Sequence, residues 1–591
     1  MKFVTIDTET TGLYVHHGHR PFLYIAKKSW EDSILVTYKL DEFVEFMKGT
    51  EGIPRVFYNA AFDLDMLQAV GVDLSQDSFC CMVMKHLIDG GDGGNKLINA
   101  SQKYLPKDQW KKADLVDDWF KANKIPLKER RYDHVPSKIM LEYAKYDVIA
   151  TEALFKLFMP MIEMLGLYDL LLQEMEFVQT SRAINKRGMH IDVAYFVYLD
   201  AKYLELLTEA HDKMIAIAGR RLNLNSPKQI GQMLSKQGFE LPKTKNGNYT
   251  TKKDIIARID HPFLNELTRY NQLNTIRDTY IDGIIRADVN GVLYPNLMST
   301  TTVTGRLSCR NPNLQNIPKK DTVIRKGFIC RPGYCNFYID YKQMEYRVFA
   351  AYAGETELIR QINEEDADFH TIIMDEFPEY FKGDRAKVKT FNFMLIYGGG
   401  INALAEKLAI TVASARDLKK TYFSRFQNVD KFFKAVKRTG EECGFVLNKY
   451  GRRYSTPKDF WGNLQSYKLI NYLDQGSCAD YVKDRMNKLE VYLKDKPQRV
   501  LLQVHDELII ETPIGEYEWL HGAIEILEDS MEIFGVKLGV DVSVSFNSWA
   551  DKQDWDLNTM STKGHSDVGT RTGDTENYIF ETEDAEEEWT S

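Results

Sequence analysis

The sequence predicts a multidomain protein of the α/β and α+β classes, with a small N-terminal unit followed by a larger mixed one. Its 591 residues exceed the roughly 100 to 200 residues that one domain usually holds. Residues 1–160 alternate short apolar strands with helical stretches, which is typical of an α/β unit, and residues 165–300 show long amphipathic helical runs. Apolar strands at 334–340 and 500–511 enclose a helical middle, so the second sheet is expected to combine distant segments.

The composition is that of a soluble globular protein with reduced cysteines. Apolar residues make up 44% of the chain and charged residues 27%, so it can form packed cores. The seven cysteines are scattered and include no CxxC pair, which argues against a zinc site or a disulfide framework. The N-terminal MKFVTIDTETTG lacks the apolar stretch of a secretory signal. We therefore expect a cytoplasmic protein with no membrane segment.

The net charge of −9 is concentrated near the C-terminus. Residues 556–591 hold ten acidic side chains against Lys563 and Arg571, with few large apolar ones, so this acidic tail is expected to be disordered. The preceding residues carry 74 basic and 75 acidic side chains. Attraction to a polyanion would therefore have to come from local basic patches rather than from bulk charge.

The first candidate site is a group of acidic side chains in the N-terminal unit. In DTETTGL, residues 7–13, Asp7 and Glu9 lie on one face because side chains alternate along a strand. Their separation of about 6 to 7 Å suits two carboxylates that share a pair of divalent ions. An isolated pair of this kind is more typical of a solvated strand face, so other segments decide between the two interpretations.

Two further segments favour the metal site. NAAFDLDML at 59–67 contains Asn59 and Asp63, and YAKYD at 143–147 contains Tyr143 and Asp147 one helical turn apart. In this order the segments resemble the proofreading 3′-5′ exonucleases of the DEDDy class, which have a ribonuclease H-like fold. The resemblance covers residues 1 to about 155 and implies an active exonuclease domain over 1–160.

The same resemblance implies a role for each of these side chains. Tyr143 would position the attacking water, and Asn59 would contact DNA. The implied ligands of two Mg²⁺ ions are Asp7, Glu9, Asp63 and Asp147.

A second pair of acids lies in the larger unit. NFYIDYKQMEYR at 336–347 contains an apolar strand ending at Asp340, where a carboxylate is costly unless it binds something. VLLQVHDELIIE at 500–511 indicates two strands joined at His505 and Asp506, a hairpin with the acid at its tip. An aspartate in a turn is common by itself. Two strand-end aspartates can, however, hold two Mg²⁺ ions for phosphoryl transfer.

A helix between these two acids presents cations and aromatic rings on one face. Arg385, Lys389, Phe393 and Tyr397 recur every four residues in GDRAKVKTFNFMLIYGGG. Asp384 is expected to cap this helix, and the glycines that follow are expected to end it. The aromatic spacing alone is typical of core packing. Stacked cations without an acid on the same face cost about a few tenths of a kcal/mol, and a bound polyphosphate would reverse that cost.

Five blocks of the larger unit resemble family A DNA polymerases, the family of bacterial DNA polymerase I and of the replicases of short-tailed bacteriophages. The blocks are, in order, TVTGRLSCRNPNLQNIP at 302–318, DYKQMEYR at 340–347, the helix at 385–397, NYLDQGSCAD at 471–480 and QVHDEL at 503–508. The resemblance covers about 165–555. It implies a right-hand polymerase fold, with a thumb at about 170–300, a palm at about 300–345 and 475–555, and fingers at about 346–474.

This resemblance also assigns roles to single residues. Asp340, Asp506 and the Tyr341 carbonyl would bind two catalytic Mg²⁺ ions, for which Mn²⁺ is a substitute. Glu345 would crowd the sugar 2′ position and select deoxynucleotides, and Phe393 implies poor use of dideoxynucleotides. The residues implied to bind the incoming nucleotide are Arg385, Lys389, Phe393, Tyr397, Glu345, His370 and Gln343. Those implied to contact the primer-template are Arg306, Gln315, Asn471, Gln475 and His505.

The sequence departs from the family pattern in two ways. Tyr467 stands where polymerase I-like members have an arginine, so that DNA contact is lost or comes from Lys468. No N-terminal 5′-nuclease domain is expected either, and this expectation favours a bacteriophage replicative enzyme acting in the host cytoplasm. A basic loop at 241–253 is interpreted either as a phosphate-binding thumb tip or as a solvated charge run; its lysines are Lys243, Lys245, Lys252 and Lys253.

Two other functions are compatible with parts of the sequence. A single-subunit RNA polymerase would share the palm chemistry, but Glu345 and the exonuclease segment argue against it. A non-catalytic DNA-binding scaffold is disfavoured because all six catalytic acids are present. The expected partners are primer-template DNA and deoxynucleoside triphosphates, with the chain acting as a monomer. The acidic tail is interpreted either as a docking segment for a helicase, primase or single-stranded DNA-binding protein, or as a solubilising end.

Overall fold

The N-terminal unit is built on a five-stranded sheet with the order β3-β2-β1-β4-β5. The computed structural model describes residues 1–563 apart from 245, 257–258 and 319–321. β1 pairs antiparallel with β2 and parallel with β4. The strands are β1 Val4–Thr10, β2 Pro21–Lys28, β3 Ile34–Thr37, β4 Arg55–Phe57 and β5 Ser78–Cys80. The helices are α1 Leu40–Met47, α2 Ala60–Gln68, α3 Cys81–Asp89, α4 Leu97–Tyr104, α5 Ala113–Ala122 and α6 Ser137–Met164.

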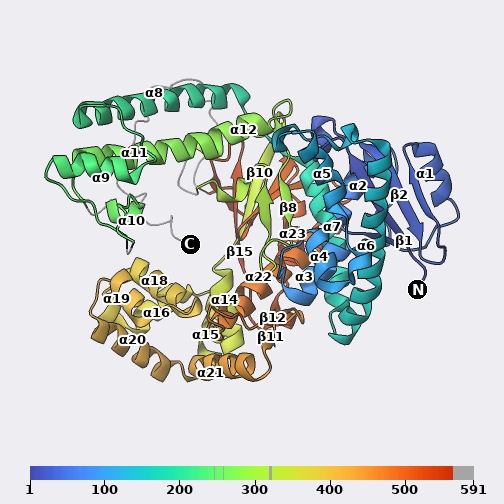
Figure 1. Ribbon diagram of the computed structural model, residues 1–591. Coiled ribbons are helices and arrows are strands. Elements are labelled where there is room, and N and C mark those ends of the chain that lie inside the picture. The colour runs from blue at the N-terminus through green and yellow to red at the C-terminus, as the bar shows by residue number, and fades with distance from the viewer. Residues whose placement is uncertain (245, 257–258, 319–321, 564–591) are drawn as a thin grey trace.

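Both faces of this sheet are covered by helices, at the right of Figure 1. Along β2, Tyr24 and Ala26 enter one hydrophobic core, while Leu23 and Ile25 enter another. This alternation follows from the two-residue period of a strand. The α/β class predicted for this unit is therefore confirmed, and β1 is held in place from both sides.

One long helix, α7 Tyr168–Arg187, joins the N-terminal unit to the rest of the chain. Leu170, Leu171 and Met175 pack into the core of the N-terminal unit. Phe177 and Ile184 of the same helix pack into the core of the larger unit. The predicted boundary at 160–165 falls at the C-terminal end of α6, which ends at Met164, and α7 itself belongs to both cores.

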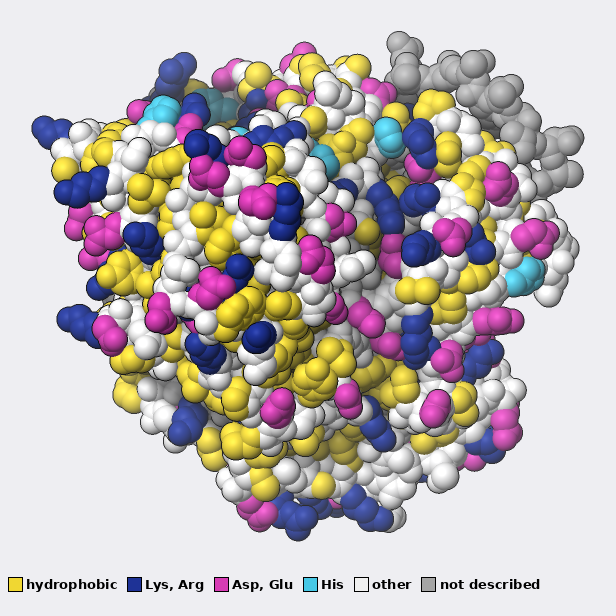
Figure 2. All heavy atoms as spheres, turned by 90° about the vertical axis from the view of Figure 1, so that its right-hand side faces the viewer, with side chains coloured by type: hydrophobic (Ala, Val, Ile, Leu, Met, Phe, Trp, Pro, Cys, Tyr) yellow, Lys and Arg dark blue, Asp and Glu magenta, His cyan; other side chains and the backbone are white. Residues whose placement is uncertain are grey.

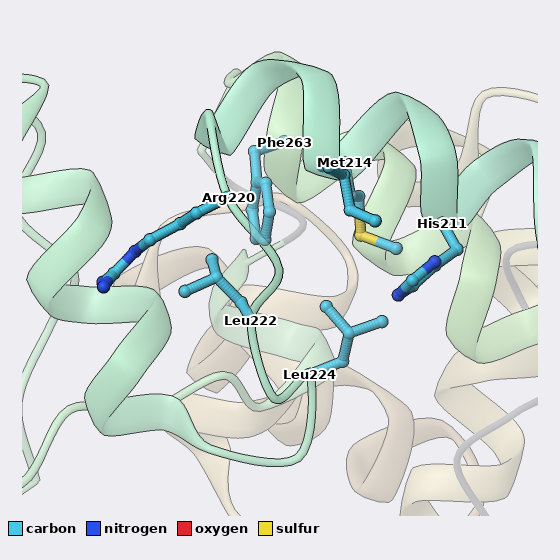
Figure 3. Close-up of a pocket in the computed structure, with 7 residues that line it drawn as sticks. His211, Met214, Arg220, Leu222, Leu224 and Phe263 are labelled. Atoms are coloured by element: carbon cyan, nitrogen blue, oxygen red, sulfur yellow. The ribbon is translucent and has the colours of Figure 1, made fainter.

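A helical arm follows, at the upper left of Figure 1. Its helices are α8 Val193–Ala218, α9 Pro227–Lys236, α10 Lys253–Ile256, α11 Pro262–Thr275 and α12 Asp282–Ala287, with a π-helical turn at Ile276–Ile281. Near its tip, α8, α11 and the loop after α8 line a small apolar pocket between His211, Leu224 and Phe263 (Figure 3). The described lining of this pocket includes no acidic side chain.

The predicted basic loop at 241–253 is partly ordered. Lys243 pairs with Tyr249 as an isolated β-bridge, and its Nζ lies 5.0 Å from the centroid of the Tyr249 ring. Lys243 and Lys252 are exposed. Lys245 and the side chain of Lys253 lie outside the described residues. The assignment as a phosphate-binding tip stays a prediction.

A six-stranded antiparallel sheet forms the centre of the larger unit, with the order β13-β14-β10-β15-β16-β17. β10 therefore pairs with strands that lie far along the chain, as predicted. The strands are β10 Tyr334–Tyr341, β13 Arg499–Val504, β14 Glu507–Pro513, β15 Val540–Ser545, β16 Gln553–Asp556 and β17 Ser561–Thr562. The helices beside this sheet are α14 Met344–Ala353, α22 Lys468–Leu493, α23 Trp519–Glu528 and α24 Met531–Phe534.

The start predicted for the disordered tail, residue 556, is wrong because the next residues are ordered. Residues 556–563 contain the end of β16 and all of β17, which pair through Trp555 with Thr562 and Asp556 with Ser561. Trp555 is buried in the main core, which anchors this hairpin. The remainder of the predicted acidic tail, 564–591, lies outside the described residues.

A helical lobe occupies the lower left of Figure 1. It contains α15 Thr356–Glu365, α16 Phe369–Glu376, α17 Pro378–Phe381, α18 Arg385–Ile396, α19 Ile401–Lys407, α20 Val412–Arg425 and α21 Gln427–Glu442, followed by β11 Phe445–Leu447 and β12 Arg453–Ser455. Short elements between α7 and the central sheet are β6 Met189–His190, β7 Val292–Leu293, β8 Asn296–Met298, β9 Ser308–Arg310 and α13 Thr322–Lys326.

The surface of the N-terminal side mixes charges of both signs (Figure 2). This agrees with the near balance of charge over residues 1–555. Within the described residues, no helix combines the length and apolarity that a membrane crossing requires.

Candidate active sites

Three carboxylates from two elements converge in the N-terminal unit. Asp7 and Glu9 project from the same face of β1, and Asp147 comes from α6. One oxygen of each lies within 4.8 Å of the others. The two-residue spacing predicted for a strand is thus realised, and α6 brings the third acid across the sheet to it.

Asp63, on α2, lies beside this group. It is 3% exposed, and its Oδ1 accepts hydrogen bonds from the amide and hydroxyl of Thr8, at 3.1 and 2.8 Å. After burial, Asp63 is the first of the neighbouring charges that raise the pKa of Asp7. All four predicted acids are therefore brought together, although Asp63 is not part of the tightest group of three.

The carboxylates of this cluster disfavour one another's charged forms. Burial, with repulsion from Asp147 next, raises the pKa of Glu9 to about 8, and burial raises the pKa of Asp63 to about 7. Oδ1 of Asp147 is buried without a hydrogen-bond partner among the described residues. Crowded carboxylate oxygens and an unpartnered buried oxygen are what a hard divalent cation requires, so the residues fit Mg²⁺.

Lys111, which the sequence analysis did not identify, is the cation found in this cluster. It lies between α4 and α5, and its Nζ donates to Oδ2 of Asp147. The same Nζ lies 4.6 Å from the centroid of the Tyr143 ring. Burial lowers the pKa of Lys111, but the surrounding acids, Asp147 foremost, raise it well above its usual range. Lys111 therefore stays charged and offsets part of the repulsion.

The two remaining predicted residues of this unit are positioned by helices. Tyr143 lies one turn before Asp147 on α6 and is buried. Asn59 directly precedes α2, and its side chain does not cap that helix, so it stays available near Asp63.

In the larger unit, Asp340 and Asp506 lie at the same end of the central sheet, where β10 and β13 end and β14 begins. Asp340 stands near the end of β10, opposite Glu507 of β14. Asp506 lies in the two-residue turn of the β13–β14 hairpin, where His505 has a φ of 55° as such turns require. The Tyr341 amide donates to the Asp506 carbonyl at 3.1 Å. The hairpin predicted from the sequence is confirmed, and 165 residues of intervening chain fold away from it.

A hydrogen-bonded network beside these aspartates joins four predicted residues. Arg306 lies 3.3 Å from Glu345 and 3.8 Å from Asp506. The Tyr397 hydroxyl donates to Glu345 at 3.1 Å, and the Gln475 amide donates to that hydroxyl at 2.6 Å. The network fixes Glu345 from α14, Tyr397 from the end of α18 and Gln475 from α22 in one place. Nearby, Gln315 donates to the Gln503 carbonyl at 3.0 Å.

The helix α18 forms where it was predicted, with one difference on its cationic face. Asp384 caps it by accepting from the Lys387 amide at 3.1 Å. Lys389 Nζ lies 5.8 Å from the centroid of the Phe393 ring. Arg385, however, pairs at 2.6 Å with Asp368, the residue that caps the start of α16, rather than with an acid of α18 itself. Spacing along one helix could not reveal this partner.

His370 and Gln343 lie around the same segment. Burial lowers the pKa of His370 to about 4, so its ring is neutral, and its Nδ1 lies 3.0 Å from Asn392 Nδ2. Gln343 donates to Asp368 and accepts from the Phe369 amide at 2.9 Å. In this structure Gln343 therefore orders the start of α16, a contact that differs from the nucleotide contact predicted for it.

Asp474 on α22 is a second residue that the sequence analysis did not identify. It is 1% exposed, and neither carboxylate oxygen has a hydrogen-bond partner among the described residues. Burial, followed by repulsion from Glu345, raises its pKa well above its usual range. Asn471, one turn earlier, likewise has a buried Oδ1 without such a partner. The predicted DNA contacts of Asn471 and His505 are not tested by these observations.

The fold and the two carboxylate sites define a class of protein: an exonuclease-type α/β domain joined to a polymerase fold. A family model described as 3′-5′ exonuclease matches residues 1–163, and the model of DNA polymerase family A matches residues 194–551. The chain belongs to DNA polymerase family A. The predicted family and fold class are confirmed.

Several bacterial relatives are similar to this chain. It is 33% identical over 380 residues to DNA polymerase I of Geobacillus stearothermophilus, covering 60% of this chain and 43% of that protein. It is 29% identical over 497 residues to DNA polymerase I of Rhizobium leguminosarum, covering 79% and 48%. The chain thus spans less than half the length of these relatives.

A solved structure shares the fold over nearly the whole chain. The POL domain of Pol1 from M. smegmatis, in complex with DNA primer-template and dNTP, superimposes with a TM-score of 0.76 at 24% identity. The match covers 93% of this chain and 95% of that one.

Proposed function

We propose that the chain is a DNA-directed DNA polymerase that extends a primer 3′ end and also removes nucleotides from that end. The observation that carries this proposal is that Asp340 and Asp506 lie at the same end of the central sheet in a chain of family A. The N-terminal carboxylate cluster supports the second activity. In this assignment the helical arm is the thumb, the central sheet with α14 and α22 is the palm, and the helical lobe is the fingers.

Asp340, Asp506 and the Tyr341 carbonyl would hold Mg²⁺ at the polymerase site. Two bound ions would lower the pKa of a primer 3′-hydroxyl and neutralise charge on the triphosphate. The protein contributes fixed positions, because Asp340 stands on a paired strand and the Tyr341 amide holds the turn that carries Asp506.

The exposed face of α18 would bind the incoming triphosphate. Arg385 and Lys389 offer charge-assisted hydrogen bonds to phosphate oxygens, which would replace the Asp368 carboxylate now paired with Arg385. The neutral ring of His370 lies beside Asn392 of the same helix, and Phe393 and Tyr397 would supply an aromatic surface for the base.

Glu345 would select the sugar. The Tyr397 hydroxyl and Arg306 hold its carboxylate beside Asp506, so it cannot swing away from a 2′-hydroxyl without breaking both contacts. This positioning would favour deoxynucleotides over ribonucleotides. It therefore supports a DNA polymerase rather than an RNA polymerase.

The primer-template would be contacted by donors around the same network, namely Arg306, Gln315, Asn471, Gln475 and His505. All base pairs present acceptors in the minor groove, so donors there can test the shape of a pair without reading its sequence.

At the N-terminal site, Asp7, Glu9, Asp63 and Asp147 would hold two Mg²⁺ ions in the same manner. Tyr143 would orient the attacking water, and Asn59 would contact the strand being degraded. Lys111 would offset the remaining negative charge near the reacting phosphate.

The biological setting stays a prediction. The relatives reported above are bacterial, and a bacteriophage replicase is inferred from the sequence alone. Docking of a helicase, primase or single-stranded DNA-binding protein would involve 564–591, outside the described residues.

The two activities can be separated by point substitutions in a primer-extension assay with four deoxynucleotides and Mg²⁺. Asp340→Asn is expected to abolish extension while degradation of a mismatched 3′ end persists. Asp7→Ala is expected to do the reverse. Binding of DNA with neither activity in the unmodified chain would favour the scaffold interpretation, and extension with ribonucleotides alone would favour the RNA polymerase.

A further inference from the structure

Two adjacent aromatic side chains stand out on the surface of the larger unit. Phe460 is 92% exposed and Trp461 is 82% exposed, in the loop between β12 and α22. Their ring centroids are 5.2 Å apart at an interplanar angle of 87°. Single exposed apolar residues are ordinary, but a neighbouring pair this exposed indicates a binding surface.

The loop that presents them is a preformed turn. Oδ1 of Asp459 accepts from the amides of Trp461 and Asn463, at 2.9 and 2.8 Å, and Oδ2 accepts from the Asn463 side chain at 2.9 Å. Lys458 pairs with Leu464 across the base of the turn. Gly462 has a φ of 85°, which the reversal requires. The backbone that carries the aromatic pair is therefore already ordered, so little backbone entropy is lost when the pair binds a partner.

The chain leads from this turn to the proposed insertion site, the place beside Asp340, Asp506 and Glu345 where a nucleotide would be added. After Leu464 comes Tyr467, which directly precedes α22 and is itself exposed. The Tyr467 ring lies against Gly398, since a Cβ there would approach its Cδ2 to 2.6 Å. Gly398 follows Tyr397, whose hydroxyl bonds to Glu345. Exposed apolar side chains thus continue from the turn to the side chains around Glu345.

The charges around the turn suit a polyanion. Lys458 is exposed and Lys468 half-buried, and neither forms an ion pair with another side chain in the described part of the chain. The acid at the tip, Asp459, is engaged within the turn. Flat aromatic rings flanked by free cations are what stack and neutralise single-stranded nucleic acid.

We propose that Phe460 and Trp461 form a stacking platform for unpaired template bases ahead of the insertion site. This inference rests on the proposed polymerase function. The strand that must lie unpaired next to that site is the template not yet copied. Stacking on the pair would hold this strand in register with Tyr467 and Tyr397, and the two lysines would contact its phosphates.

The test compares two DNA duplexes with the same base-paired region, one blunt and one whose template strand extends as a 5′ overhang of about ten nucleotides. Binding is measured by fluorescence anisotropy in EDTA, which prevents both reactions. Stacking contributes about 1 to 3 kcal/mol per base, so the unmodified chain should bind the overhang substrate about tenfold more tightly than the blunt one. The double variant Phe460→Ala/Trp461→Ala should lose this preference and keep its affinity for the blunt duplex.

Two controls separate stacking from general damage. Phe460→Tyr/Trp461→Phe keeps the aromatic faces and should keep the preference. Trp30→Ala removes an exposed tryptophan from the N-terminal unit and should leave both affinities unchanged. An equal overhang preference in the alanine variant and the unmodified chain would overturn the inference. A second result would also overturn it: the unmodified chain self-associates, and the alanine variant loses this self-association but keeps the overhang preference. The aromatic surface would then bind a second copy of the chain.

Failure of this inference differs from failure of the proposed function. Primer extension by the unmodified chain on the same overhang substrate reports the function alone. Extension without any overhang preference overturns only the stacking platform, whereas no extension at all overturns the polymerase assignment.

Discussion

At the scale of single residues, Glu345 combines burial with two directed contacts. Replacing it by alanine removes the carboxylate that Tyr397 and Arg306 hold beside Asp506. We expect Glu345→Ala to raise ribonucleotide incorporation relative to deoxynucleotide incorporation by roughly tenfold or more, since about 1.4 kcal/mol of barrier is a factor of ten. Single-turnover incorporation of matched nucleotide pairs measures this ratio. Tyr397→Phe, which removes only the hydroxyl, should change it less; an unchanged ratio in Glu345→Ala would refute the sugar-selection role.

Lys111 offers a second prediction at this scale. It contacts Asp147 and the Tyr143 ring inside a cluster of mutually repelling acids. Lys111→Met keeps the length of the side chain but leaves the acids without this cation. We expect the free energy of unfolding in EDTA to fall by at least about 1 kcal/mol, or roughly 3 °C in Tm.

Excess Mg²⁺ should narrow that difference, because bound cations would replace the lost charge. Thermal unfolding with and without Mg²⁺ measures both effects. A variant as stable as the unmodified chain in EDTA would show that Lys111 does not balance the cluster.

At the scale of elements, α7 and α22 are joined by a buried ionic network. Arg452, which follows β11, pairs with Glu174 of α7 and with Asp480 of α22 at 2.7 Å. Lys483 contacts the same two acids. Burial raises the pKa of Asp480, but the nearby cations, Arg452 foremost, outweigh it and lower that pKa to about 2. Each acid therefore remains charged only because cations accompany it.

Removing one cation from this buried network should lower the free energy of unfolding strongly, whereas removing one from the surface should change it little. Arg452→Met leaves Glu174 and Asp480 under-compensated, so we expect a loss of about 3 to 5 kcal/mol. Arg360→Met breaks an exposed group of ion pairs on α15 and should change stability little. Urea unfolding of both variants tests the contrast. Equal, small losses in both would mean that the buried network adds nothing to stability.

The elements were predictable where a local pattern determines them. The period of two placed Asp7 and Glu9 on one face of β1, and the cap at Asp384 predicted the start of α18. Side chains delivered by a different element were not predictable. Lys111 reaches Asp147 from a loop, and Asp368 reaches Arg385 from the position before α16, so only the tertiary fold brings these pairs together. Trp555 likewise lies just before the predicted tail, yet it anchors the hairpin whose second strand, β17, falls inside it.

At the scale of the whole molecule, the N-terminal unit holds a segment of the larger one. His86 Nε2 of α3 lies 2.8 Å from the Thr302 carbonyl, and the Asn95 amide donates to the Thr300 carbonyl. Arg306, of the network around Glu345, follows four residues after Thr302. The N-terminal unit is therefore linked to the network around Glu345 through the loop that carries Arg306.

The stability of the folded chain should depend on pH through His86. Burial, then repulsion from Arg452, lowers the pKa of His86 from 6.5 to about 4 in the folded chain. Because the folded state disfavours the proton, its stability contribution is complete above about pH 6.5 and is lost as pH falls toward 4. Between about pH 7 and 5.5 the loss should be on the order of 1 kcal/mol.

His86→Gln lacks this titration and retains a side-chain amide near Thr302. The fall in Tm on acidification should therefore be smaller in the variant than in the unmodified chain. Parallel falls in the two proteins would indicate that His86 is not a source of the acid sensitivity.

The helix α7 has a practical consequence for engineering. Its apolar face packs Leu170, Leu171 and Met175 against the N-terminal unit, while its far end lies in the main core. Deleting the first 163 residues would expose that apolar face to water and remove the contact between His86 and the Thr302 carbonyl. Substitution of Asp7 should therefore remove the proposed exonuclease activity with less damage to the fold than deletion of the N-terminal unit. Transfer of the larger unit to another protein would require new apolar side chains to cover α7.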